Sequence, residues 1–114
     1  MKFMLQVRFN GADAAISRLP VDEQQTINAE FEAIRRLPGV LDGNQLQPMS
    51  TATIVDAGNR RAHSADLSSV GSSGAIDGYY LYDAADLEAA IALAERIPAT
   101  KFGASVEVRA VVER

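Results

Sequence analysis

The sequence has no cysteine and a single histidine, His63. Without a thiol, the chain can form no disulfide and can offer no thiolate to a metal ion or to a covalent intermediate. One imidazole also argues against a metal site built from histidines. We therefore expect neither a metal nor another cofactor.

Positive charge and long hydrophobic runs are also scarce. The chain has 11 Lys and Arg against 15 Asp and Glu, a net charge of -4. A protein that binds along the phosphate backbone needs clustered basic residues, so no nucleic-acid partner is expected. The start MKFMLQVRFNG lacks the apolar centre of a secretory signal, and no run of about 18 apolar residues could span a membrane. We expect a cytoplasmic chain with no membrane contact.

What is present is ordinary globular composition. The chain has 114 residues, of which 47% are hydrophobic and 23% charged, far from the composition of disordered proteins. This length suits one hydrophobic core. The sequence predicts a single domain over residues 1–114.

Alternation of apolar and polar residues predicts the strands. In residues 2–9, Phe3, Leu5, Val7 and Phe9 alternate with polar or flexible side chains, which is the period of a strand with one apolar face. Further strands are predicted over residues 40–47, 51–57, 60–65, 75–83 and 105–113. Gly58-Asn59 is the expected hairpin turn between the third and fourth strands, because both residues tolerate positive φ.

Helical spacing predicts two helices. The first begins at Asp22 as N-cap, with Gln25 in the reciprocal position, and ends near Leu37; its apolar side is Ile27, Phe31 and Ile34. The second follows Asp83 as N-cap and ends at Ile97. Its expected buried face consists of Leu87, Ala90, Ile91, Ala94 and Ile97.

This order of strands and helices predicts an α+β fold, a ferredoxin-like split βαβ sheet with both helices on one face. The opposite face would carry Met4, Gln6 and Arg8, and the aromatic strand around Tyr80 has large side chains for both faces. Face-to-face pairing in a homodimer would bury that surface and leave a mixed polar and apolar cleft. The alternative is a monomer with scattered exposed tyrosines.

Three segments resemble one known family. MKFMLQVRF, GVLDGNQLQPMSTATIV and GYYLYDAADLEAAIALAERIPATKFGASVEVR are similar in order and spacing to the YCII-related proteins of the DGPF-motif type. The resemblance spans nearly the whole chain and implies a dimeric α+β barrel. Most such relatives have no assigned activity, and some occur attached to or beside transcription sigma factors.

The chain departs from the family pattern where chemistry is concerned. The Asp-Gly-Pro-Phe signature falls on Asp66-Leu67-Ser68-Ser69, so only the aspartate is kept. Relatives with proposed chemistry resemble lyases that use a histidine of the first helix, where this chain has Gln24 or Gln25. The resemblance therefore implies an architecture more than a reaction.

The segment HSADLSSVGSSG, residues 63–74, combines His63, Asp66 and five serines. A Ser/His/Asp triad needs a histidine within reach of a hydroxyl and a carboxylate together with an oxyanion hole. No G-x-S-x-G elbow is present, and Ser68 to Gly74 consists mainly of serine and glycine. We interpret this segment as a strand end followed by a mobile loop, with His63 and Asp66 as the candidate proton-transfer residues.

The predicted hairpin suggests a second cluster. A Gly58-Asn59 turn would set Asp56 opposite Arg61 and Ile54 opposite His63. Two interpretations of Asp56, Arg61 and His63 are open. They form either an exposed ion pair beside an imidazole or the rim of a cleft in which Arg8 or Arg61 binds an anion. The Tyr80 hydroxyl is a further ligand candidate, although a tyrosine on a central strand also suits a core or an interface.

Together these features predict a homodimeric protein that binds a small polar or anionic molecule in a cleft. Whether it is an enzyme stays open. If it is, proton-transfer or lyase-type chemistry without a cofactor fits best, with His63 or Asp66 as acid or base and Arg8, Arg61 and Tyr80 on the ligand. The alternative is a non-catalytic module that regulates a protein partner.

Overall fold

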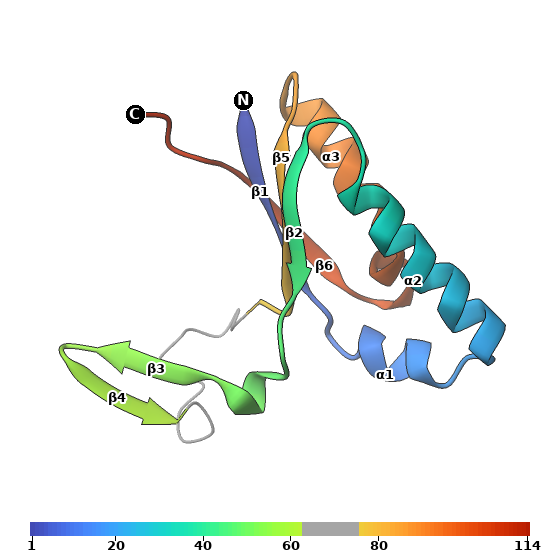
Figure 1. Cartoon of the computed structure of the whole chain (residues 1–114), viewed down its shortest axis with the longest axis horizontal. Coiled ribbons are helices and arrows are strands. Elements are labelled where there is room, and N and C mark those ends of the chain that lie inside the picture. Colours follow the sequence, from blue (N-terminus) through green and yellow to red (C-terminus); the bar gives the residue numbers. More distant parts are fainter. Residues whose placement is uncertain (63–75) are drawn as a thin grey trace.

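The computed structural model describes residues 1–62 and 76–114 and shows an α+β domain (Figure 1). Its main sheet contains β1 (Lys2–Arg8), β2 (Val40–Gln45), β5 (Gly78–Asp83) and β6 (Ser105–Ala110). The strands are ordered β2-β5-β1-β6, and each neighbouring pair is antiparallel. This order is compatible with the predicted ferredoxin-like split.

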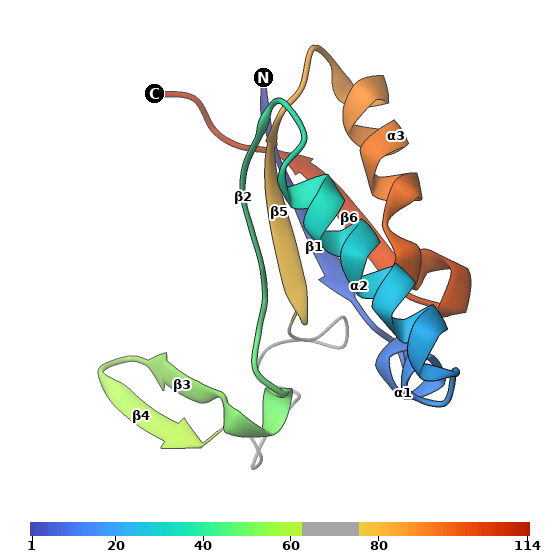
Figure 2. The same cartoon turned by 45° about the vertical axis from the view of Figure 1, so that its right-hand side comes forward.

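The two longer helices, α2 (Val21–Arg35) and α3 (Leu87–Arg96), lie on the same side of the main sheet (Figure 1), and the turned view of Figure 2 agrees. Short 3-10 helices occur at Met49–Thr51 and Pro98–Phe102. None of the helices in the described part of the chain is long and apolar enough to cross a bilayer.

The core lies between the sheet and these helices. On β1, buried Phe3, Leu5 and Val7 alternate with half-buried residues of the other face. They meet Ile34 of α2 and Leu93 of α3 within one buried cluster. Burial of each large apolar side chain stabilises the fold by about 1.5–3 kcal/mol, so the alternation read from the sequence correctly identifies the core face of β1.

The first predicted helix differs from the prediction at its beginning. Residues 12–17 form an additional short helix, α1 (Ala12–Ser17), where only a connection was expected. The N-cap of α2 is Pro20, without a side-chain hydrogen bond, so the prediction of Asp22 as N-cap is wrong. Proline fixes its own φ and can directly precede a helix, which places Asp22 in the first turn, where its charge still favours the helix. The helix ends at Arg35, before Leu37.

The N-cap of α3 is Asp86, whose carboxylate accepts a hydrogen bond from the Ala89 amide at 2.8 Å. The prediction of Asp83 is wrong, because Asp83 ends β5 and instead binds the N-terminal ammonium at 3.1 Å. Leu87 is 49% exposed rather than buried, since it lies at the first helical position, past the end of the buried stripe. The buried positions are Ala90, Leu93 and Ala94, followed by Ile97 after the helix.

The predicted hairpin exists, but its turn is one residue earlier than expected. Strands β3 (Thr53–Asp56) and β4 (Asn59–Ala62) are joined by Ala57 and Gly58, with φ of 47° and 82°. Two positive φ values suit the twist of a two-residue hairpin, but alanine rarely adopts one, so Gly58-Asn59 was the stronger signal. The register places Ile54 opposite Arg61 and Asp56 opposite Asn59, which corrects the predicted pairing. Both views show the hairpin projecting away from the main sheet (Figures 1 and 2).

Candidate functional site

A cavity of about 270 Å³ opens between α2 and the edge of the sheet formed by β2 and β5. The residues that line it are Val7, Phe9, Asn28, Phe31, Glu32, Arg35, Gly43, Asn44, Gln45, Gly78, Tyr79 and Tyr80.

Two glycines help to create this space. Gly43 pairs with Tyr80 on the helix-facing side of the sheet, and Gly78 pairs with Val7 on the same side. A Cβ atom on Gly43 would lie 2.5 Å from Cδ1 of Tyr80, far inside van der Waals contact. Glycine at position 43 therefore lets the Tyr80 ring lie across β2, and the missing side chain at Gly78 leaves volume beneath α2.

The floor of the cavity is apolar and well fixed. Val7, Phe9 and Phe31 surround Tyr80, which is only 6% exposed. The Tyr80 hydroxyl donates a hydrogen bond to the Phe31 carbonyl oxygen at 3.0 Å, which joins the sheet to α2. Burial, reinforced by the nearby Glu32 carboxylate, raises the pKa of Tyr80 to about 12. Tyr80 is therefore a neutral wall of the cavity at physiological pH rather than a proton acceptor.

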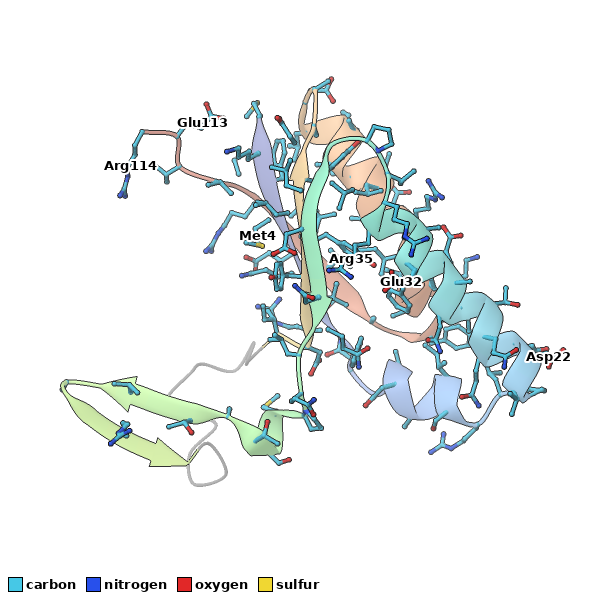
Figure 3. All side chains as sticks on the ribbon, in the orientation of Figure 1. Met4, Asp22, Glu32, Arg35, Glu113 and Arg114 are labelled. Carbon is cyan, nitrogen blue, oxygen red and sulfur yellow. The ribbon has the colours of Figure 1, made fainter. Side chains whose placement is uncertain are left out.

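Opposite charges lie at the rim on α2. Figure 3 shows Glu32 and Arg35 between α2 and β2. Nη1 of Arg35 lies 4.0 Å from Oε1 of Glu32, and the two side chains are 47% and 57% exposed. A contact this long and this exposed stabilises the helix by a few tenths of a kcal/mol, about 0.3–0.5. Both groups can therefore change partners at little cost.

A hydrogen-bonded cluster lies on β2 and β5 on the sheet face opposite α2, because Asp42, Asn44 and Tyr79 alternate with the helix-facing Gly43 and Tyr80. The Tyr79 hydroxyl donates to Oδ2 of Asp42 at 2.8 Å, and the Asn44 amide donates to the Tyr79 oxygen at 3.1 Å. The Gly43 amide donates to Oδ1 of Asp42 at 2.9 Å. The Tyr79 hydroxyl, followed by the Gly43 amide, holds the pKa of Asp42 below its usual value. Asp42 is thus an ionised acceptor and a weak base.

Asp77 holds together the strand ends beside the cavity floor through hydrogen bonds. Its carboxylate accepts a hydrogen bond from the Phe9 amide, and its own amide donates to the Val7 carbonyl oxygen, both at 2.7 Å. Its carbonyl oxygen accepts from the Leu46 amide at 2.8 Å. One residue thus connects the ends of β1, β2 and β5 beside the cavity.

The structure separates the residues that the sequence proposed as ligand contacts. Tyr80 lines the cavity, but its hydroxyl already donates to Phe31. Arg8 lies on the opposite face of the sheet, is 19% exposed and has its Nη2 3.7 Å from Oε1 of Glu107. Arg61 belongs to β4 in the projecting hairpin. His63, Asp66 and the Ser68–Gly74 segment lie outside the described residues.

The sequence reasoning missed the charged pair of the cavity. Asn28, Glu32 and Arg35 flank the apolar stripe Ile27, Phe31 and Ile34, and they share one side of α2 by helical spacing. A second signal was the repeated Asp-Gly pair, with Asp42-Gly43 in β2 and Asp77-Gly78 at the start of β5, two of the strands that border the cavity. Only the strand pairing in the structure shows that the helix residues and the two Asp-Gly pairs lie around the same cavity.

No family model and no curated protein matches the chain. Residues 1–62 and 76–114 hold no group of three or more acidic or histidine side chains placed to bind a metal ion. What the described geometry offers is a small concave site with an apolar floor, one guanidinium, one carboxylate and several amides. Such a site is suited to binding a small polar molecule.

Proposed function

We propose that this protein binds a small carboxylate-bearing molecule in the cavity between α2 and β2. The carboxylate lies on Arg35, and the apolar part of the molecule lies on the floor formed by Val7, Phe9 and Phe31. The observation that carries this proposal is the loose contact of Arg35 at the cavity rim, where its Nη1 lies 4.0 Å from Oε1 of Glu32.

Hydrogen-bond geometry favours a ligand over this internal contact. An arginine holds a carboxylate by two parallel bonds of about 2.7–2.9 Å, whereas the Glu32 contact is 4.0 Å long. A carboxylate ligand would therefore give Arg35 a better partner. The cavity of about 270 Å³ lies just below the range of about 300–1,000 Å³ typical of drug-sized ligands, which favours a metabolite-sized molecule.

The resemblance to YCII-related proteins supports, as a further part of the proposal, cofactor-independent proton-transfer or lyase-type chemistry on the bound molecule. His63 and Asp66 are the residues proposed for that step. In the cavity itself, Tyr80 keeps its proton, and Asp42, on the other face of the sheet, is a weak base. Binding can therefore be tested separately from turnover.

We also propose that two chains pair through the sheet face opposite the helices. Met4 lies opposite Leu81 in the middle of that face, and both are half-buried in one chain (Figure 3 shows Met4). No described helix covers them. The resemblance supports the same arrangement, a dimeric α+β barrel.

Titration calorimetry with butyrate, hexanoate, benzoate and 3-phenylpropionate tests the binding proposal. Arg35→Gln should weaken the binding of the tightest of these probes at least tenfold, which is about 1.4 kcal/mol. Arg36→Gln is the matched control, because Arg36 is the exposed next residue and does not line the cavity; it should change the affinity less than twofold. Equal losses in both variants, or no binding of any probe to the wild type, would contradict the proposal. Ligand-independent capture of one specific protein partner would favour a regulatory module instead.

A further inference from the structure

We propose that the cavity selects a free α-amino acid with an apolar side chain over a simple carboxylate, because Glu32 and Arg35 stand side by side at its rim. In this arrangement Arg35 holds the ligand carboxylate, Glu32 holds the ligand ammonium, and the side chain enters the apolar floor. This inference rests on the proposed carboxylate site and assigns its ligand class.

The first support is the charge of the lining. Glu32 and Arg35 are the two formally charged residues among those that line the cavity, so their charges cancel. A simple carboxylate that bound Arg35 would add a second negative charge beside Glu32. Like charges that lie close together repel each other. A zwitterion meets an opposite charge at each end and leaves the cavity neutral.

The second support is the distance between the two groups. At 4.0 Å, Nη1 of Arg35 and Oε1 of Glu32 are too far apart for a hydrogen bond. Both side chains keep hydrogen-bonding capacity for a ligand that offers an acceptor and a donor on neighbouring atoms. The carboxylate and ammonium of an α-amino acid are attached to the same carbon, so they offer this pairing within one small molecule.

The third support is the field at the floor. The carboxylates of Glu32 and Glu30 both raise the pKa of Tyr80, against the opposing effect of Arg35. At the Tyr80 hydroxyl, the negative potential of these carboxylates therefore outweighs the positive potential of Arg35. This potential favours a ligand ammonium and disfavours an uncompensated carboxylate.

The floor defines the rest of the ligand. Val7, Phe9 and Phe31 contribute aliphatic and aromatic surface to the lining. The volume of about 270 Å³ suits an amino acid with a branched aliphatic or aromatic side chain. A charged side chain would lose its hydration there without a partner.

Titration calorimetry with three matched probes tests the inference. The probes are L-leucine, 4-methylpentanoate, which lacks the amino group, and 3-methylbutylamine, which lacks the carboxylate. Leucine should bind the wild type at least tenfold more tightly than either analogue. In the Glu32→Gln variant, the affinity for leucine should fall at least tenfold. The affinity for 4-methylpentanoate should stay the same or rise. Glu32→Asp should keep part of the preference, and Glu23→Gln, an exposed change in the first turn of α2, should leave all three affinities within twofold.

The outcomes separate the two proposals. If 4-methylpentanoate binds the wild type as tightly as leucine, or if Glu32→Gln keeps the leucine preference, the amino-acid assignment is overturned and the carboxylate site stands. If neither leucine nor 4-methylpentanoate binds the wild type, both proposals are overturned. The comparison of the three probes on the wild type decides the question even if Glu32→Gln folds poorly.

Discussion

Tyr80 connects the sheet, α2 and the cavity floor through one side chain. Its ring lies over Gly43, its hydroxyl binds the Phe31 carbonyl oxygen, and its burial keeps the phenol neutral. The sequence left open whether this residue belongs to the core or contacts a ligand, and its 6% exposure places it in the core. The sequence could not show that the hydroxyl is already bonded within the chain, because that depends on where α2 packs.

The raised pKa of Tyr80 predicts a loss of stability at high pH. The pKa is about 12 in the folded chain against an ordinary value of about 10, so the unfolded state loses this proton first. The contribution to the free energy of unfolding is complete below pH 10 and declines as the pH rises toward 12. Denaturant unfolding across this range should show the decline in the wild type and a smaller one in Tyr80→Phe.

A near-ultraviolet tyrosinate titration provides the control. The wild type minus Tyr80→Phe difference should show one phenol that ionises near pH 12. A difference curve centred at pH 10 would show that Tyr80 is solvated and would contradict the described floor.

At the scale of elements, the sequence predicted what repeats along the chain and missed what depends on a single contact. Alternation found the core face of β1, and helical spacing found Ile34 and Ala94. The cap of α3 was wrong because Asp83 and Asp86 are both good N-cap residues, and only the path of the chain after β5 decides between them. The turn was wrong because Ala57 adopts a positive φ that alanine seldom adopts.

The two aspartates before α3 provide a matched test. Asp86→Ala removes the side-chain acceptor of the Ala89 amide and should lower the free energy of unfolding by about 0.5–2 kcal/mol. Asp83→Ala removes an exposed contact with the N-terminal ammonium and should cost at most about 1 kcal/mol, within the lower part of that range. Asp86→Asn should keep most of the cap. Chemical denaturation of all three variants would disprove the assignment if Asp83→Ala were the more destabilising change.

At the scale of the whole molecule, the composition and the element order predicted an α+β domain, and the strand order agrees with the predicted split. The cavity was not predicted, because it depends on Gly43 of β2, Gly78 of β5 and Arg35 of α2, which lie far apart in the sequence. Of the ligand residues inferred from local pattern, Arg8 and Tyr80 lie on opposite faces of the main sheet, and Arg61 lies in the projecting hairpin. Pairing, rather than spacing along one strand, determines which residues share a site.

The open sheet face predicts the assembly. Light scattering should return about twice the chain mass of 12.2 kDa, because pairing buries Met4 and Leu81. Met4→Arg should shift the protein toward monomer, whereas Val55→Arg, an exposed change on the projecting hairpin, should not. A wild type that is monomeric at micromolar concentration would contradict the dimer.

The site between α2 and β2 is tested most directly by amide chemical-shift mapping with hexanoate. On saturation, we expect the largest changes at Gly43, Gly78 and Phe31, together with a shift of the Arg35 Nε–H signal. These changes should disappear in Arg35→Gln and persist in Arg36→Gln. The largest changes at Met4, Gln6 and Leu81 on the other face of the sheet, or no saturable change at all, would contradict the account.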